Sequence, residues 1–373
     1  MSNRFRLLVC AGLLSAAGAV AAKGAPDPRA TALIAELGLK PAAVASRDLP
    51  GWKSPTRVVV ATDDGELVTK LQSLVPGVEV LAAAEDDAAR GAQLAEAQVV
   101  VGLCDAETLA AAKSLHWIQA LWVGVENCVS VPGLAERGIV LTNMQRTSGR
   151  PIAEHAIALM LALSRGLPQF ARHQHAGRWQ RDPAAAHVMR EVGGRTMLVV
   201  GLGGIGTEVA RRGHALGMRV IATRNSTREG PDFVAKVGLP GDLLAYAAEA
   251  DVVVNAVPLT PSTTGIFNRA FFDAMKPDGL FVNVARGRSV VTDDLVAALR
   301  SGRLAGAALD VTDPEPLPDG HALWSMPNVV ITPHVAAESS VQGERDDILI
   351  AENLRRYVAG EPLLNVVDIA RGY

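Results

Sequence analysis

Cysteine is scarce in this sequence, with only three among 373 residues. Cys10, Cys104 and Cys128 form no CxxC pair and show no metal-ligand spacing. Their pattern therefore signals neither a zinc site nor a disulfide framework, and it leaves the redox compartment of the protein open. We expect no metal in the functional site.

An excess of charge is also missing. The chain has 36 Lys and Arg residues against 39 Asp and Glu residues, a formal net charge of -3 at pH 7. A basic excess that would attract nucleic acid or an anionic membrane surface is therefore absent, and we expect a small-molecule partner and no nucleic acid. A hydrophobic content of 49% excludes disorder as the dominant state and supplies apolar material for two domains.

Long hydrophobic runs are absent except for a short one near the start of the chain. Arg4 and Arg6 precede an apolar run over residues 7–20, which ends in Ala21 and Ala22. This order is typical of a secretory signal peptide over residues 1–22, whose cleavage would make the protein periplasmic or exported. A run of about 14 residues is short for a bilayer span, although a short membrane anchor is the alternative. Without export the protein is cytoplasmic, and we expect no stable membrane span in the mature form.

The remaining chain divides into an N-terminal extension over residues 23–55 and two series of alternating elements. In the first series, β-branched runs alternate with amphipathic ones, and we expect strands at residues 57–61, 78–81, 98–101, 117–121 and 139–141. A long helix over residues 152–164 follows Pro151 and marks the domain boundary.

The second series has expected strands at residues 197–200, 219–223, 252–256, 280–284, 306–309 and 329–331. Alternation of this kind predicts parallel sheets covered by helices, so the fold class is α/β with two doubly wound domains. A closing helix near residues 344–357 is too short to be a domain, and we expect it to pack back onto one of the two.

A glycine-rich turn follows the first strand of the second series. Residues 201–206 read Gly-Leu-Gly-Gly-Ile-Gly, and a helix is expected to follow. Gly201 permits the tight turn, Gly203 lets the backbone approach a pyrophosphate, and Gly206 lets helix and strand pack closely. The helix N-terminus offers free amides to an anion. We therefore expect a dinucleotide at this turn, with Gly204 and Ile205 included in the site, although an accidental glycine-rich turn is the alternative.

The carboxylate that normally binds the ribose hydroxyls of NAD is missing after the second strand of this series. Residues 222–228 read Ala-Thr-Arg-Asn-Ser-Thr-Arg. The guanidinium of Arg224 suits a 2′-phosphate, and Asn225 and Ser226 lie in the same loop. The loop predicts NADP(H) in preference to NAD(H). An exposed loop with ordinary solvated arginines is the alternative.

Three later segments, each after a strand, carry groups suited to reducing a 2-oxo acid. They contain Arg286, Glu315 and His334. Ligands of doubly wound sheets bind beyond the carboxyl ends of strands, so the three side chains are expected to converge. The reaction needs a cation for the carboxylate and carbonyl, an acid for the developing alkoxide, and a group that orients the acid. Arg286, His334 and Glu315 fit these roles in that order.

These segments resemble the signature stretches of the D-isomer-specific 2-hydroxyacid dehydrogenases. The glycine turn, a Val-Pro-Leu-Thr-Pro turn at residues 257–261, Asn-Val-Ala-Arg-Gly at 283–287, Leu-Asp-Val followed by Glu-Pro, and Thr-Pro-His occur in the family's order. The resemblance extends from about residue 56 to the end of the sequence. It implies a Rossmann nucleotide-binding domain over residues 152–334, inserted in a flavodoxin-like substrate domain formed by residues 56–151 and 335–373.

The resemblance also implies roles for individual residues. Arg286 would bind substrate, His334 would be the general acid or base, and Glu315 would keep that imidazole protonated toward neutral pH. The resemblance places further groups around the ligands: Val257, Pro258 and Thr264 on the adenosine side, Ala285 and Asp310 near the nicotinamide, and the amides of Val123 and Gly124 on the substrate carboxylate. Members often have Asp where Glu126 stands and a small residue where Trp122 stands, which leaves the substrate range open.

The expected function is NADP-dependent reduction of a small 2-oxo acid, similar to glyoxylate or hydroxypyruvate, to the D-2-hydroxy acid by a homodimer. One alternative is a non-catalytic nicotinamide-sensing regulatory protein of the same fold. Another is a dehydrogenase of a different small anion, such as formate or phosphite. Export would conflict with this function, because reduced nicotinamide cofactors belong to the cytoplasm.

Overall fold

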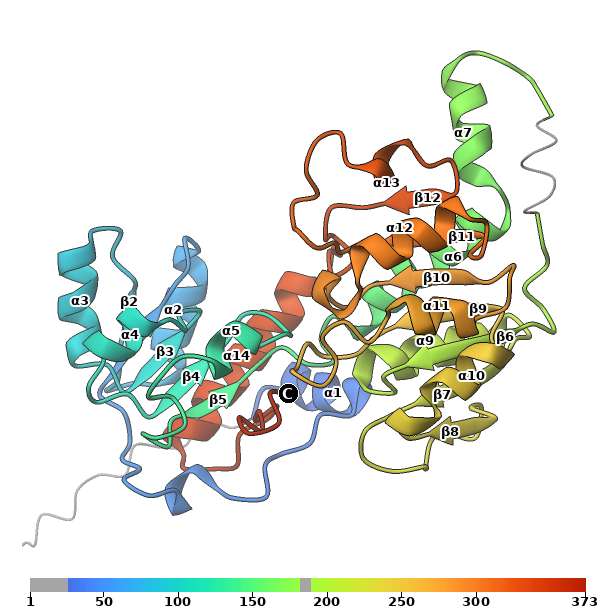
Figure 1. Ribbon diagram of the computed structural model, residues 1–373. Helices are drawn as coiled ribbons and strands as arrows, with labels where there is room; N and C mark the ends of the chain where they lie inside the picture. The colour runs from blue at the N-terminus through green and yellow to red at the C-terminus, as the bar shows by residue number, and fades with distance from the viewer. Residues whose placement is uncertain (1–25, 182–188) are drawn as a thin grey trace, which may run out of the picture.

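The computed structural model describes residues 26–181 and 189–373, which fold around two separate parallel sheets. The two sheets lie side by side and are each covered by helices (Figure 1). The predicted fold class is confirmed. The expected signal peptide at residues 1–22 lies outside the described residues. No helix in the described ranges is long and apolar enough to span a bilayer.

The first sheet has five parallel strands in the order β2-β1-β3-β4-β5. The strands are β1 (Arg57–Val60), β2 (Glu79–Ala82), β3 (Val99–Val101), β4 (Trp117–Gln119) and β5 (Val140–Thr142). The helices α2 (Gly65–Leu74), α3 (Asp87–Ala95), α4 (Ala106–Ala111) and α5 (Glu126–Val129) connect them. Asp64, Asp86 and Asp105 cap α2, α3 and α4 by accepting hydrogen bonds from first-turn amides, which explains where these helices begin.

The second sheet has seven parallel strands in the order β12-β11-β10-β9-β6-β7-β8. The strands are β6 (Thr196–Val200), β7 (Arg219–Thr223), β8 (Lys236–Gly238), β9 (Val252–Asn255), β10 (Leu280–Asn283), β11 (Gly306–Leu309) and β12 (Val329–Ile331). Its helices are α6 (Gly149–Ser164), α7 (Leu167–His175), α9 (Gly204–Ala215), α10 (Leu243–Glu249), α11 (Arg269–Ala274), α12 (Thr292–Arg300) and α13 (Ala322–Ser325). Short 3-10 turns span Ser46–Asp48, Pro240–Asp242 and Gly287–Ser289. The sequence patterns did not predict β8.

The closing helix α14 (Gln342–Val358) returns to the first sheet. It packs against α2 and against α1 (Pro28–Leu37), and its Leu349 and Leu354 share an apolar core with Val58 of β1. The segment expected as an extension is therefore integrated with the fold, because Leu33 and Leu37 of α1 are buried in that same core.

One expectation about cysteine is wrong. Cys104, in the loop after β3, and Cys128, in α5, form a disulfide across 24 residues of sequence, with their Cα atoms 5.3 Å apart. The spacing of cysteines in the sequence gave no hint of this pair, because the two residues meet only once β3 and β4 lie side by side in the sheet.

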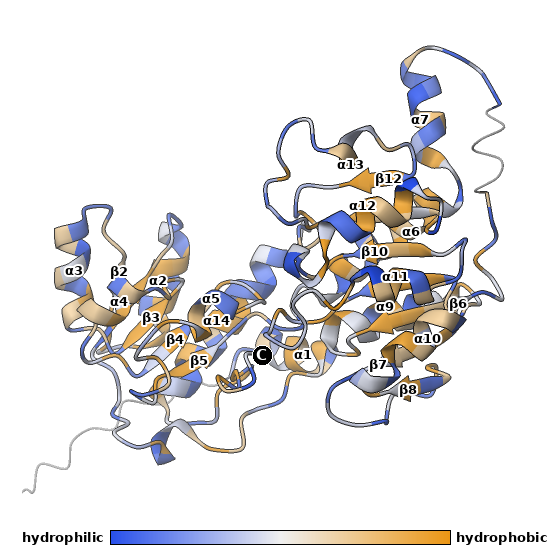
Figure 2. Cartoon of the chain, viewed as in Figure 1, coloured by the Kyte–Doolittle hydropathy of each residue, from blue (hydrophilic) through white to orange (hydrophobic). Residues whose placement is uncertain are grey.

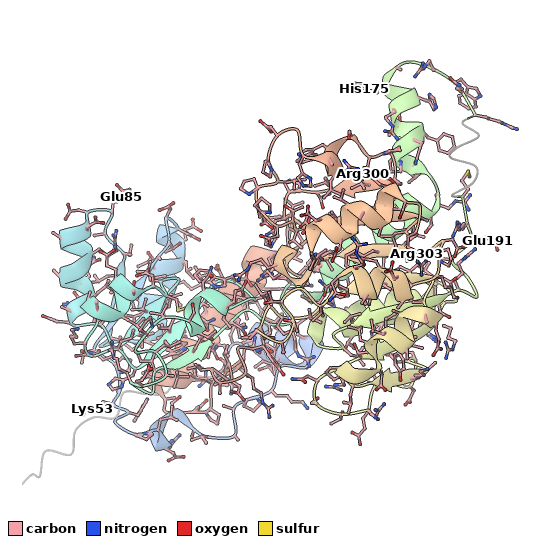
Figure 3. The ribbon with its side chains drawn as sticks, in the orientation of Figure 1. Lys53, Glu85, His175, Glu191, Arg300 and Arg303 are labelled. Carbon is pink, nitrogen blue, oxygen red and sulfur yellow. A yellow bond between two sulfur atoms is a disulfide. The ribbon has the colours of Figure 1, made fainter. Side chains whose placement is uncertain are left out.

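Apolar residues lie inside each domain and most charged residues lie on its surface. Hydrophobic residues fill the strands and the helix faces against them, as Figure 2 shows. The charged side chains labelled in Figure 3, which include Lys53, Glu85, Glu191 and Arg300, lie on the outer surface. Parallel sheets buried on both faces bind ligands at the carboxyl ends of their strands. We therefore expect the functional site at these strand ends.

Candidate functional site

The glycine turn between β6 and α9 leaves an open approach to the backbone. Gly201 has a φ of +97°, and a Cβ there would come within 2.7 Å of the Ala256 carbonyl oxygen. Gly206 packs against the Gly201 carbonyl, so a side chain has no room. A Cβ on Gly203 would meet nothing within 4 Å, which leaves this side of the turn accessible.

The N-terminus of α9 is suited to an anion. Gly203 is its N-cap and supplies no side-chain hydrogen bond to the first-turn amides of Gly204 and Ile205. Uncapped amides and the positive end of the helix dipole favour a phosphate. A pyrophosphate therefore fits the turn, and the geometry agrees with the group that the sequence led us to expect.

The loop after β7 presents Arg224, Asn225 and Ser226 beside this turn. The Arg224 amide donates to the Gly238 carbonyl at 3.0 Å, so the unpredicted strand β8 supports the loop. One guanidinium nitrogen of Arg224 donates to the Glu229 carbonyl at 3.0 Å. Asn225 and Ser226 are exposed, and the Arg224 side chain keeps further N–H groups for a ligand.

Two buried asparagines, which sequence reasoning missed, connect the ends of β9 and β10. Asn255 and Asn283 are partners in the strand register, and Asn255 Nδ2 donates to Asn283 Oδ1 at 2.9 Å. Asn255 Oδ1 accepts from the Val257 amide, whereas Asn283 accepts from the Ala285 amide and donates to the Arg286 carbonyl. The only signal in the sequence was a polar residue at the end of each apolar strand.

Arg286 lies between the two sheets and is held by Glu126. Its Nε donates to Glu126 Oε1 at 2.6 Å, and its Nη1 donates to the Ala285 carbonyl at 2.8 Å. The guanidinium lies directly over Gly124, where a Cβ would overlap it. The side chains of Arg286 and Glu126 keep 28% and 24% of their surface exposed, so the cation remains accessible to a small anion.

The loop after β4 brings backbone donors to the same place. Neither the Val123 amide nor the Gly124 amide donates to a protein acceptor within the described ranges. Asn143 fixes the loop, since its Nδ2 donates to the Val123 carbonyl at 2.6 Å. Trp122 is 40% exposed beside these amides. Two free amides next to a guanidinium form a suitable site for a carboxylate.

His334 and Glu315 form the second part of the site. Nδ1 of His334 lies 2.6 Å from Glu315 Oε1, although 19 residues separate them in sequence. His334 has a φ of +55°, and its amide donates to the Asp310 carbonyl at 2.8 Å. With Nδ1 bonded to the carboxylate, Nε2 is left to face a ligand.

Asp310 supports this loop from within. Its side chain is 1% exposed and accepts hydrogen bonds from Thr332 Oγ1 and from the amides of Val335 and Ala336. His155 of α6 contacts Thr332 Oγ1 at 2.9 Å and completes the support. The Asp310 carboxylate therefore stabilises the loop that carries His334 by accepting these hydrogen bonds.

The structure brings most of the sequence-predicted residues to adjacent strand ends. Arg286, Glu315 and His334 follow β10, β11 and β12, which are neighbours in the sheet. Gly287 packs against the Thr312 carbonyl, which joins the loops after β10 and β11. In the turn after β9, Pro258 and Thr264 are exposed, and Thr264 Oγ1 donates to the Thr260 carbonyl at 2.9 Å.

Comparison with known proteins relates this geometry to characterised chains. Residues 157–336 match the family model for the D-isomer specific 2-hydroxyacid dehydrogenase, NAD binding domain. The D-3-phosphoglycerate dehydrogenase of Archaeoglobus fulgidus is 37% identical over 271 residues, which are 71% of this chain and 49% of that protein. This chain thus spans about half the length of that relative.

Shorter relatives are covered more fully. The glyoxylate reductase of Korarchaeum cryptofilum is 35% identical over 269 residues, covering 71% of this chain and 79% of that protein. The NADPH-dependent glyoxylate/hydroxypyruvate reductase of Sinorhizobium meliloti, solved in complex with NADP and sulfate, superimposes with a TM-score of 0.73 at 29% identity. That match covers 85% of this chain and all of the solved one.

Proposed function

Because the chain belongs to the D-isomer specific 2-hydroxyacid dehydrogenase family, a family of NAD(P)-dependent oxidoreductases, we propose that it reduces a small 2-oxo acid to the D-2-hydroxy acid. Glyoxylate and hydroxypyruvate are the first candidates. The observation that carries the proposal is the placement of Arg286, with two free backbone amides, beside the hydrogen-bonded pair of His334 and Glu315.

The residues divide the work by their chemistry. The amides of Val123 and Gly124 and the guanidinium of Arg286 bind the carboxylate, and the guanidinium also polarises the oxo group. His334 Nε2 delivers a proton to the developing alkoxide, while Glu315 is bonded to Nδ1 and orients the ring. A dihydronicotinamide, when bound, would supply the hydride that the oxo carbon accepts. Ala285, whose carbonyl accepts from Arg286, borders the expected nicotinamide side.

NADP(H) is the proposed cofactor. The glycine turn fits a pyrophosphate, and Arg224 and Ser226 occupy the place where a carboxylate would bind the NAD ribose. Arg224→Ala should weaken NADPH binding by about tenfold to a hundredfold and leave NADH binding nearly unchanged. Arg228→Ala is the matched control, since Arg228 forms an ion pair with Asp242 at 2.8 Å. Equal losses for both cofactors would contradict the assignment.

The reaction itself is tested by mixing the protein with NADPH and a panel of 2-oxo acids and following cofactor absorbance. We expect oxidation of NADPH with at least one small 2-oxo acid. Formate and phosphite belong in the panel with NADP, because a protein that uses one of them would oxidise that anion and leave the 2-oxo acids unchanged. No change with any acid would overturn the proposal.

Catalysis by His334 separates an enzyme from a nicotinamide sensor. His334→Gln should abolish turnover and preserve NADPH binding, because Nε2 is needed for proton transfer and not for cofactor affinity. His214→Gln, at an exposed position in the last turn of α9, is the matched control and should keep full activity. A sensor would bind NADPH with no turnover in wild type.

Location and assembly are proposed on the sequence alone. We propose that residues 1–22 are a signal peptide, whose cleavage would make Lys23 the first residue and the protein periplasmic or exported; without cleavage the protein is cytoplasmic. Sequencing the first residues of protein from fractionated cells checks this. We also propose a homodimer, which sedimentation of the purified protein checks.

A further inference from the structure

The last residues of the sequence pass from the first sheet to the second. Asn365 Nδ2 donates to the carbonyls of Asn143 and Gln145, which anchors the segment beside β5. The segment then turns, with the Gly372 amide donating to the Asp368 carbonyl at 2.8 Å. Its end lies between the two sheets in Figure 1.

This end contacts two loops of the nucleotide-binding sheet. Asn225 Nδ2, in the loop after β7, donates to the hydroxyl oxygen of Tyr373 at 3.0 Å. A Cβ on Gly372 would lie 3.8 Å from Thr260 Cγ2, in the loop after β9. Strand β6 lies between β7 and β9 in the sheet, so these loops flank the glycine turn on either side. The segment therefore lies against the two loops that border the site expected for the adenosine half of the cofactor.

The direction of the hydrogen bond leaves Tyr373 with a free proton. An amide nitrogen only donates, so Asn225 uses a lone pair of the phenol and not its hydrogen. No acceptor for the Tyr373 hydroxyl occurs in residues 26–181 or 189–373. Tyr373 is 39% exposed, and Ser226 follows Asn225 directly in the chain. A phosphate at this loop would thus meet three kinds of donor: a guanidinium, an aliphatic hydroxyl and a phenol.

We propose that Tyr373 is a cofactor-specificity residue, whose hydroxyl donates a hydrogen bond to the 2′-phosphate of NADP while Asn225 holds the phenol in place. The inference rests on the proposed function in one respect, the use of NADP. In this inference, Tyr373, which lies in the segment expected to belong to the substrate domain, takes part in recognition of the cofactor. Binding of cofactor would then also hold the two sheets together through residues 365–373.

Tyr373→Phe tests the hydroxyl alone, with equilibrium binding of NADPH, NADH and 2′,5′-ADP measured by calorimetry. We expect the Kd for NADPH and for 2′,5′-ADP to rise about tenfold, and the Kd for NADH to change less than twofold. Tyr246→Phe is the matched control, because Tyr246 is a buried tyrosine in α10 of the same sheet. Thermal melting should give the same transition for all three proteins.

The outcomes separate this inference from the proposed function. If wild type binds NADPH in preference to NADH and Tyr373→Phe binds both as wild type does, Tyr373 has no role in recognition. An equal loss for NADPH and NADH would also overturn the inference, since the 2′-phosphate would not be the group recognised. Wild-type protein that fails to bind NADPH would overturn the proposed cofactor itself.

Discussion

Gly124→Ala offers a sharp test of how the substrate site is built. The residue has no positive φ that would strain an alanine, so the effect of the added methyl group is purely steric. A Cβ at this position would lie 2.7 Å from Arg286 Cζ and 2.7 Å from Glu126 Oε2, and it would overlap a guanidinium nitrogen. Ordinary contacts begin near 3.4 Å, so Arg286 Cζ and Glu126 Oε2 must each withdraw by roughly 0.7 Å, and the overlapping guanidinium nitrogen must withdraw by more.

A displacement of this size is large for a group that we propose binds the substrate. Misplacement by about 1 Å costs about a hundredfold in rate, so we expect kcat/KM for the 2-oxo acid to fall by about that factor, or about 2.7 kcal/mol. The assay is steady-state oxidation of NADPH with the best 2-oxo acid of the panel. The Kd for NADPH should stay unchanged, because Gly124 is in the loop after β4 and the glycine turn follows β6.

Gly343→Ala, where a Cβ would meet nothing within 4 Å, is the matched control and should retain full activity. A folded Gly124→Ala variant with kcat/KM within threefold of wild type would refute the reasoning. In that case, Arg286 would not bind the substrate in the position where the structure holds it.

Two further predictions concern stability. Asn283→Ala removes a buried acceptor and donor and leaves the Ala285 amide unpaired, so the free energy of unfolding should fall by about 1–3 kcal/mol in urea titration; an unchanged midpoint would contradict this. Burial raises the pKa of Asp346 above its ordinary value of 3.8. Well below pH 3.8, the Asp346 carboxyl is protonated in both the folded and the unfolded protein. As pH rises, the carboxyl ionises first in the unfolded chain, so the free energy of unfolding falls until the pH passes the pKa of the folded state. Asp346→Asn should therefore raise Tm at pH 7 and lose this advantage near pH 3, whereas Asp319→Asn, at an exposed position, should change Tm at neither pH.

The sequence predicted the parts of the fold that follow from local pattern. Alternating apolar runs located most strands, and the glycine turn was assigned to its strand and helix because both flank it directly in sequence. Strand β8 was missed because Lys236–Gly238 contains a single β-branched residue between a lysine and a glycine, whereas the equally short β12 consists of three β-branched residues.

Contacts between distant segments were beyond such reasoning. The pairing of Arg286 with Glu126 spans 160 residues and depends on how the two sheets meet, which no local pattern encodes. The Cys104–Cys128 pair was missed because the two residues meet only when β3 and β4 pair within the first sheet. His334 and Glu315 were placed together through motif order, whereas the asparagines that fix the neighbouring loops were not singled out, since a single polar residue at a strand end has many explanations.

The hydrogen bond between Asn255 and Asn283 couples the positions of the loops after β9 and β10. Val257, on the turn expected beside adenosine, and Arg286, beside the expected substrate, are each tied to one member of this buried pair. Neither loop can shift alone without breaking a hydrogen bond to a buried asparagine side chain. The spacing between the two expected ligands is therefore set by the register of β9 and β10.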